Sequence, residues 1–75
     1  MNKIHPTAIV EEGVQLGEGA EIGPYCRVGP KVIMGDRCVL KSHVVIEGRT
    51  VIGNENVFSP FCYIGGEPQD LKYRQ

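Results

Sequence analysis

The sequence predicts an all-β chain that folds as a single parallel β-helix of about four triangular coils. Two observations predict this fold. An apolar residue recurs at every sixth position, and glycine directly follows it at six of those positions. A six-residue period fits neither an amphipathic helix nor an alternating strand, but it is typical of hexapeptide β-helices. The apolar positions are Ile4, Val10, Leu16, Ile22, Val28, Met34, Leu40, Ile46, Ile52, Phe58 and Ile64.

Three hexads per coil place residues eighteen positions apart on neighbouring strands, about 4.8 Å from each other. The frame then predicts three ladders of inward-pointing side chains, and the third ladder reaches a charged residue, Asp70. An unpaired carboxylate is costly in an apolar interior. At Asp70 we therefore expect the coil to end or the chain to loop out. The predicted ladders are Ile4/Ile22/Leu40/Phe58, Val10/Val28/Ile46/Ile64 and Leu16/Met34/Ile52/Asp70.

The opening residues IHPTAIVEEG join the frame at Ile4 and are expected to form the first coil. Pro6 suits a corner or an edge strand there. Further along, the glycine after each apolar residue is expected to supply the positive φ of a tight corner, since glycine adopts that conformation without steric cost. These glycines are Gly17, Gly23, Gly29, Gly35, Gly53 and Gly65.

A second inward position is expected two residues before each apolar residue, because side chains alternate along a strand. Small residues occupy it almost throughout, including all three cysteines. Cys26 and Cys62 share a ladder with Val44 between them, about 10 Å apart, which is too far for a disulfide. We interpret the cysteines as buried core residues. The positions are Ala8, Val14, Ala20, Cys26, Val32, Cys38, Val44, Thr50, Asn56 and Cys62.

The residue before each apolar position should point outward, and it changes from polar to apolar at Ile33. Ile33 should stack on Val51, and Val39 on Val57, which gives apolar strips on two adjacent faces; Val45 is a further apolar residue in this position. Strand propensity alone also favours such residues. Paired exposed strips favour a subunit interface, and two adjacent faces suit a closed cyclic assembly better than a two-fold dimer.

The bulk properties set the class of protein. The 75 residues suffice for one small domain, 1–75, whose modest core calls for a partner. A net charge of −1 gives no long-range attraction to nucleic acid or to an anionic membrane, and no stretch is apolar enough to insert in a bilayer. Three cysteines, an odd number, suit a reducing compartment, so we expect a cytoplasmic protein.

Few residues are candidates for chemistry. His5 is interpreted as structural or solvated; His43 lies beside a corner, from which a functional side chain could project. No spacing of metal ligands occurs. The string IGGEPQDLKY presents Gln69, Asp70 and Lys72 within four residues. An amide, a carboxylate and an ammonium can bind the hydroxyls, carbonyls and phosphates of a polar ligand. The alternative is a solvated terminal turn.

Four segments resemble the N-terminal coils of the bacterial UDP-N-acetylglucosamine acyltransferases, which catalyse the first step of lipid A biosynthesis. They are HPTAIVEEG, IGPYCRVGP, LKSHVVIEG and IGGEPQDLKY. The hexads alone indicate only the hexapeptide-transferase superfamily, whereas the PQDLKY string is more specific. The resemblance covers essentially the whole chain. It implies a left-handed parallel β-helix and a homotrimer with active sites in clefts between subunits.

The resemblance also implies the reaction. An (R)-3-hydroxyacyl group passes from acyl carrier protein, the co-substrate, to the 3-hydroxyl of UDP-N-acetylglucosamine. A histidine acts as general base on that hydroxyl, and backbone donors steady the oxyanion. No metal or dissociable cofactor is implied. By resemblance, Asp70 would bind sugar hydroxyls, and Gln69 and Lys72 would help to hold the substrate or the acyl group.

The chain also departs from this family. The family's catalytic histidine lies in later coils, within an H-x-x-H type string, and neither His5 nor His43 has that context. The family's catalytic coils and C-terminal helical domain have no counterpart here. We therefore expect an N-terminal portion that contains no catalytic residue and is inactive alone.

Two alternatives remain. One is a non-catalytic β-helical scaffold whose last strands pair end to end with another copy, as in a dimer of trimers. The other is a hexapeptide acyltransferase with a different acceptor. An ice-binding β-helix is disfavoured, because threonine occurs only at Thr7 and Thr50.

Overall fold

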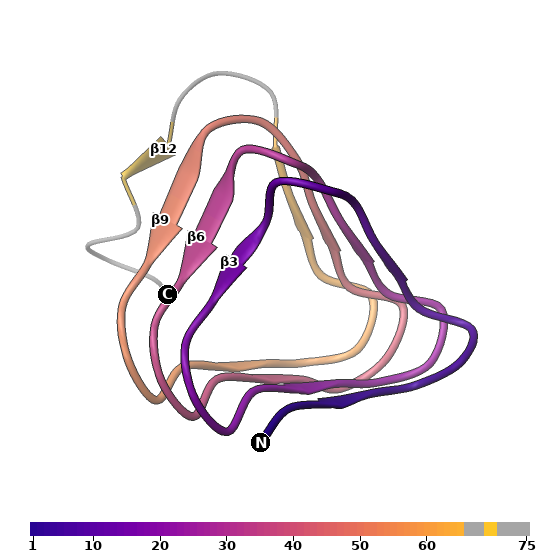
Figure 1. The fold of residues 1–75 in the computed structure, drawn as a ribbon. Helices are drawn as coiled ribbons and strands as arrows, with labels where there is room; N and C mark the ends of the chain where they lie inside the picture. Colours follow the sequence, from indigo (N-terminus) through magenta and orange to yellow (C-terminus); the bar gives the residue numbers. More distant parts are fainter. Residues whose placement is uncertain (66–68, 71–75) are drawn as a thin grey trace.

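Short strands build the whole fold. The computed structural model describes residues 1–65 and the backbone of residues 69–70; in this part of the chain, three parallel sheets form the sides of a triangular coil (Figure 1). Sheet A contains β1 (Lys3–Ile4), β4 (Glu21–Ile22), β7 (Val39–Leu40) and β10 (Val57–Phe58). Sheet B contains β2 (Ile9–Val10), β5 (Arg27–Val28), β8 (Val45–Ile46) and β11 (Tyr63–Ile64). Sheet C contains β3 (Gln15–Leu16), β6 (Val32–Met34), β9 (Thr50–Ile52) and β12 (Gln69–Asp70).

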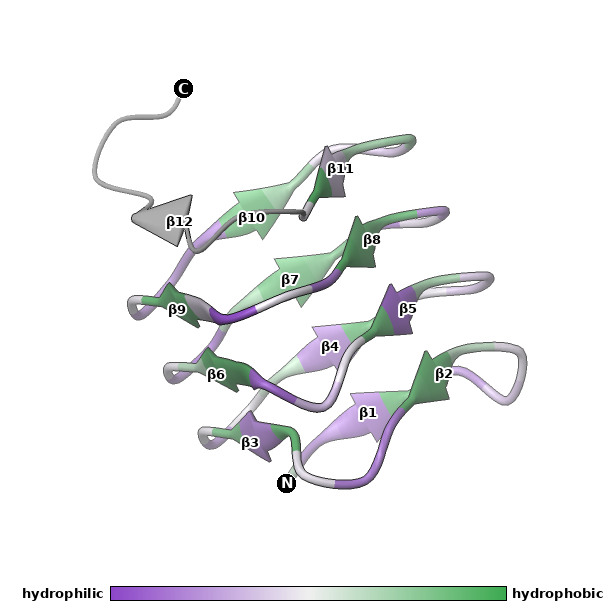
Figure 2. Cartoon of the chain, turned by 90° about the horizontal axis from the view of Figure 1, so that it is seen from above, coloured by the Kyte–Doolittle hydropathy of each residue, from purple (hydrophilic) through white to green (hydrophobic). Residues whose placement is uncertain are grey.

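The coil is left-handed, as the resemblance implied. Figure 1 looks along the axis from the N-terminal end, and the chain runs counter-clockwise as it recedes from the viewer. Seen from the side in Figure 2, the strands of each sheet climb in order along the axis. Parallel crossovers in ordinary sheets are right-handed, so the handedness is a property of this coil and not of β-structure in general.

The strand register confirms the eighteen-residue frame in sheets A and B. Ile4 lies opposite Ile22, Ile22 opposite Leu40, and Phe58 opposite Leu40. The ladder Val10/Val28/Ile46/Ile64 is likewise present in full. In sheet C, Leu16, Met34 and Ile52 form the predicted ladder. The prediction is wrong at its last position, because Asp70 lies opposite Val51 and not opposite Ile52.

The apolar core is complete only in the middle coils. Ladder residues with a coil on each side are buried, as Ile22 (2% exposed) shows, whereas Ile4 in the first coil is 45% exposed. The second inward position follows the same gradient: Cys26 and Cys38 are buried as predicted, and Cys62 is half-buried. The cysteines are free. The buried apolar residues are Ala20, Ile22, Cys26, Val28, Val32, Met34, Cys38, Leu40, Val44, Ile46 and Ile52.

The glycines that follow the apolar positions do not have the predicted role. None of them has a positive φ; among the glycines of the described residues, that conformation occurs at Gly13, Gly19 and Gly48. At Gly17, Gly23 and Gly35, glycine is required instead by the approach of the next coil. A Cβ atom on Gly23 would collide with the carbonyl oxygen of Lys41, and one on Gly35 with the side chain of Asn54.

Non-glycine residues take the left-handed conformation at two of the three corners. Between sheets A and B they are Tyr25 (φ 60°), His43 (φ 53°) and Phe61 (φ 63°). Between sheets C and A, Arg37 (φ 57°) and Glu55 (φ 60°) follow Gly19 at intervals of eighteen residues. Each such residue costs about 1–2 kcal/mol relative to glycine, so local contacts must offset the strain.

The described residues contain no helix that could span a membrane.

Candidate functional site

Strand β12 holds two of the three predicted ligand-binding residues, and it lies beside β9 in sheet C (Figure 1). Gln69 is opposite Thr50 and Asp70 is opposite Val51, a separation of nineteen residues. The other paired residues in the described parts of the three sheets are eighteen positions apart. One additional residue therefore precedes β12 in the coil.

The shift by one residue changes the face to which each position belongs, because successive residues of a strand alternate between faces. Asp70 shares its register with Val51, whose side chain is 61% exposed on the outside of sheet C. Gln69 shares its register with Thr50, whose side chain is fully buried. The register therefore gives Asp70 the position of a residue whose side chain faces outward. Lys72, the third predicted residue, lies outside the described residues.

The outer surface next to Asp70 is apolar. The outward row of sheet C runs from Gln15 through Ile33 to Val51, and Ile33 is 42% exposed. On the outside of sheet A, Val57 is 61% exposed, while Val39 is half-buried. Figure 2 shows these strands as neighbouring sides of the coil. The predicted strips therefore exist, and the strip on sheet C adjoins the register position of Asp70.

The corner between sheets A and B carries a column of stacked rings that sequence reasoning missed. The ring of His43 lies between those of Tyr25 and Phe61, with centroids 5.2 Å and 4.7 Å away and interplanar angles of 27° and 19°. Tyr25 is 61% exposed and Phe61 78% exposed. The spacing of these residues, eighteen in each case, was a readable signal. The column explains the strained corner, since each stacked pair is worth about 0.5–1.5 kcal/mol.

His5 has a local structural role, as predicted. Its Nδ1 atom lies 2.9 Å from the hydroxyl oxygen of Thr7 and accepts a hydrogen bond from the Thr7 amide at 3.2 Å. The Thr7 hydroxyl oxygen in turn accepts a hydrogen bond from the Tyr25 amide, which ties the first coil to the second. Neither His5 nor His43 lies on sheet C with Asp70. The described histidines therefore supply no general base beside the predicted site.

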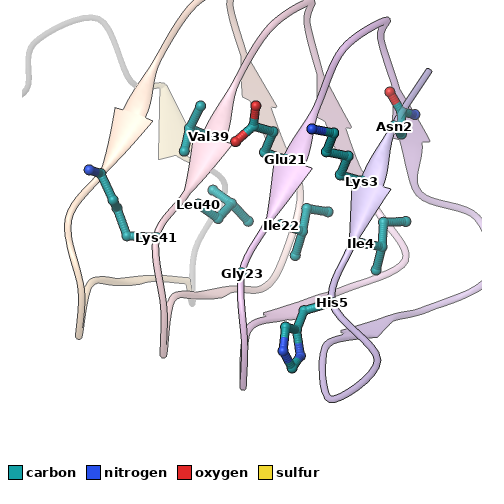
Figure 3. A pocket seen from close by; sticks show the side chains of 10 residues that line it. All are labelled: Asn2, Lys3, Ile4, His5, Glu21, Ile22, Gly23, Val39, Leu40 and Lys41. Atoms are coloured by element: carbon teal, nitrogen blue, oxygen red, sulfur yellow. The ribbon is translucent and has the colours of Figure 1, made fainter.

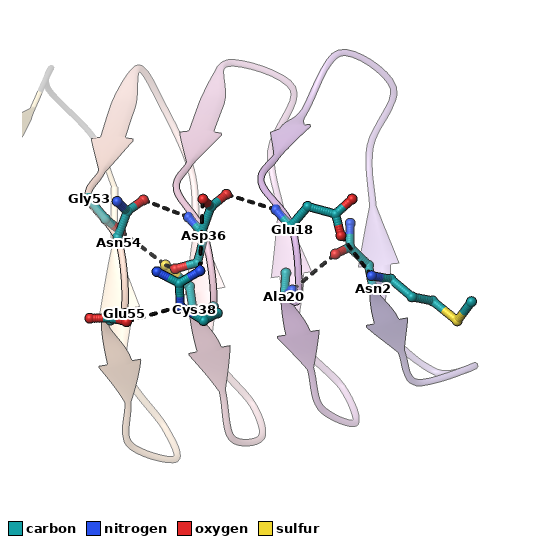
Figure 4. Close-up of polar contacts among 10 residues, drawn as sticks. Asn2, Glu18, Ala20, Asp36, Cys38, Gly53, Asn54 and Glu55 are labelled. Atoms are coloured by element: carbon teal, nitrogen blue, oxygen red, sulfur yellow. Dashed lines mark hydrogen bonds and ion pairs between the residues drawn. The ribbon is translucent and has the colours of Figure 1, made fainter.

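Polar side chains join the coils at the corner between sheets C and A (Figure 4). Asn54 Oδ1 accepts from the Asp36 amide at 2.7 Å, and Asp36 Oδ1 accepts from the Glu18 amide at 2.9 Å. The left-handed residues of this corner also meet, because Arg37 Nε donates to Glu55 Oε2 at 2.9 Å. Such bonds satisfy backbone donors that the corner leaves unpaired. The acidic groups of this corner are therefore engaged in holding coils together.

Glu11 binds Arg27 on sheet B through two donors of the guanidinium, at 2.7 Å and 3.1 Å. This hydrogen-bonded contact, together with the charge of Glu11, raises the pKa of Arg27 further above its ordinary value. Both side chains face solvent, so the pair contributes little to stability. Because Arg27 is paired with Glu11, it is less available to bind an anionic ligand.

A shallow hollow of about 660 Å³ lies on the outer face of sheet A (Figure 3). Its lining includes the charged residues Lys3, Glu21 and Lys41. Figure 3 shows that the Lys41 side chain points away from Lys3 and His5. The lining groups thus do not converge on one point, which a specific ligand site requires. The residues are Asn2, Lys3, Ile4, His5, Glu21, Ile22, Gly23, Val39, Leu40 and Lys41.

Comparison with known proteins agrees with the geometry. Residues 13–48 match the family model described as bacterial transferase hexapeptide (six repeats). Over 74 residues, or 99% of this chain, the sequence is 62% identical to a protein of Paraburkholderia phytofirmans and 68% identical to proteins of Burkholderia vietnamiensis and Burkholderia ambifaria. Each is named acyl-(acyl-carrier-protein)–UDP-N-acetylglucosamine O-acyltransferase. The chain spans 28% of the length of these relatives.

Proposed function

We propose that this chain forms the N-terminal coils of a hexapeptide-repeat transferase that acylates UDP-N-acetylglucosamine. The acyl donor would be acyl carrier protein carrying an (R)-3-hydroxyacyl group, and the acceptor atom the 3-hydroxyl of the sugar. The observation that carries the proposal is the identity of 62–68% over 99% of the chain to relatives bearing that name. The product would enter lipid A biosynthesis.

In this proposal, sheet C presents the substrate-binding residues. The nineteen-residue step gives Asp70 the register of the outward-facing Val51, so its carboxylate can accept hydrogen bonds from the hydroxyls of a sugar. Gln69 and Lys72 would hold the remainder of the substrate or the acyl group. The general base would come from outside these coils. No metal or dissociable cofactor takes part, since a base and an oxyanion site suffice for acyl transfer from a thioester.

We further propose that three copies assemble around a shared axis that runs parallel to the axis of the β-helix. Successive strands of a coil differ in height by about 1.6 Å, a third of the strand spacing. Ile33 of sheet C is therefore almost level with Val39 of sheet A, and Val51 with Val57. If sheet C of one copy faces sheet A of the next, apolar residues meet at both levels, as a cyclic heterologous interface requires. The register position of Asp70 would then lie beside the contact with a second copy.

The proposed location is the cytoplasm. Three cysteines are free, and two of them are buried in the core. Reduced thiols of this kind suit a reducing compartment.

A chimera tests the function. In the Paraburkholderia phytofirmans relative, this chain would replace the 74 residues that it matches, and transfer of a 3-hydroxyacyl group to UDP-N-acetylglucosamine would be measured. We expect turnover close to that of the parent protein. Asp70→Asn should raise KM for the sugar nucleotide, whereas Glu12→Gln, an exposed change at another corner, should have no effect. An inactive but folded chimera would refute the proposal.

A second candidate function is that of a non-catalytic β-helical scaffold. It is favoured by one observation: in the part of the chain that the structure describes, both histidines lie away from sheet C. The chimera separates the two candidates. A scaffold would support assembly in the chimera without any dependence of KM on Asp70.

A further inference from the structure

Thr50 is the one polar side chain that is buried among the described residues. It occupies the second inward position of sheet C, a position held by Val14 and Val32 in the coils before it. The hydroxyl group donates a hydrogen bond to the carbonyl oxygen of Glu47 at 3.2 Å. Valine would fill the same space without a polar group, so the hydroxyl calls for an explanation.

The explanation lies in how the corners close. At two earlier corners, a backbone amide closes the turn onto the carbonyl three residues before it. Ala8 donates to His5 at 2.9 Å, and Val14 donates to Glu11 at 3.3 Å. At Thr50 the amide donates instead to Lys31 of the preceding coil, at 3.3 Å. At this corner it is therefore the Thr50 hydroxyl, and not the Thr50 amide, that bonds to the carbonyl three residues before it.

This exchange lets β9 begin one residue earlier than most strands of the coil. The backbone of Thr50 pairs with Val32, which adds a third rung to the pairing between β9 and β6. In β6 the corresponding corner contains Pro30, whose ring fixes the backbone by itself. In β9 that position is Gly48, which is in the left-handed region (φ 78°) and imposes no such restraint. The hydroxyl bond supplies the missing restraint.

The added rung is the one on which β12 pairs. Gln69 lies opposite Thr50, so the early start of β9 accommodates the nineteen-residue step that gives Asp70 the register of Val51. We propose that Thr50 is a positioning residue: its hydroxyl holds the start of β9 and thereby sets the register of β12. The consequence for substrate binding rests on the proposed function, whereas the consequence for register does not.

The first test uses the chain itself. Amide hydrogen exchange at Gln69 and Asp70, measured by NMR, should accelerate about tenfold or more in Thr50→Val, because the pairing rung is no longer held. Thr50→Ser keeps the hydroxyl and should restore slow exchange. Val14→Ala, a core change in the first coil of the same sheet, is the control. In this variant, amide exchange at Gln69 and Asp70 should change no more than amide exchange at Ile46. Unchanged exchange in Thr50→Val would overturn the proposal. So would an equal acceleration at Ile46, which would indicate general destabilisation.

The second test uses the chimera. Thr50→Val should raise KM for UDP-N-acetylglucosamine by about tenfold while kcat changes less than about twofold, since a displaced Asp70 weakens binding without removing the base. Thr50→Ser should restore KM. A fall in kcat with constant KM would overturn the proposed role. An inactive parent chimera would refute the proposed function alone, and hydrogen exchange would still decide whether Thr50 sets the register.

Discussion

Three glycine residues of the six-residue frame, Gly17, Gly23 and Gly35, act through close packing between coils rather than through backbone freedom. A Cβ atom at Gly23 would overlap the backbone carbonyl oxygen of Lys41, the residue directly after β7. We expect Gly23→Ala to cost about 3 kcal/mol or more in the free energy of unfolding. Gly53→Ala is the control, because among the described residues a Cβ atom at Gly53 would meet only Asn56 Nδ2, at 3.8 Å, so this variant should change stability little. Urea denaturation of both variants checks the prediction, and equal midpoints would contradict it.

The ring column makes a prediction about strain at single residues. His43→Ala removes two ring contacts and keeps the strained φ of 53°, so it should cost about 1–3 kcal/mol. His43→Gly removes the same contacts but relieves about 1 kcal/mol of strain. The glycine variant should therefore be more stable than the alanine variant. This is the reverse of the usual order, in which alanine gives the more stable protein. Thermal denaturation decides: an alanine variant as stable as glycine would mean that φ at this corner is unstrained.

Along each ladder, a residue's contribution depends on whether a coil lies on both sides of it. Ile22 is 2% exposed and Ile4 is 45% exposed, although the two are neighbours in one ladder of sheet A. Ile22→Ala should cost about 2–5 kcal/mol, because it leaves a cavity in a closed interior. Ile4→Ala should cost about 1 kcal/mol or less. Similar losses for both variants, measured by urea denaturation, would show that the first coil is covered in solution by a partner.

The ladders were predictable because a strand's pattern repeats with every coil. Eighteen-residue spacing placed the partners of Ile22, Val28 and Met34 correctly, and it placed Cys26 and Cys38 inside. Register at β12 was not predictable in the same way. The frame marks Asp70 as a misfit, but whether the chain loops out or shifts by one residue depends on the length of one corner and on the hydrogen bonds of Thr50. Those are properties of contacts between coils, which a repeat in the sequence does not contain.

At the corners, too, part of the structure was predictable from the sequence and part was not. Sequence placed glycine and proline at corners correctly, yet it suggested positive φ for the wrong glycines. At the corners between sheets A and B and between C and A, the left-handed positions belong to Tyr25, His43, Phe61, Arg37 and Glu55, residues for which that conformation is unfavourable. Their side chains offset the strain only by meeting side chains eighteen residues away, so the pattern becomes readable once the coil length is known.

At the scale of the whole molecule, we propose that copies of the chain associate through the two apolar strips. We expect a cyclic trimer in sedimentation experiments, with Val51 at the contact between sheet C of one copy and sheet A of the next. Val51→Lys places an ammonium in each of the three contacts, where desolvation opposes assembly, and should weaken association by about tenfold or more. Ile9→Lys is the control, because Ile9 is comparably exposed (58%) but lies on sheet B in the first coil. If Ile9→Lys weakens association more than Val51→Lys does, the interface lies on sheet B. If the unsubstituted chain is a monomer, the strips do not cause assembly.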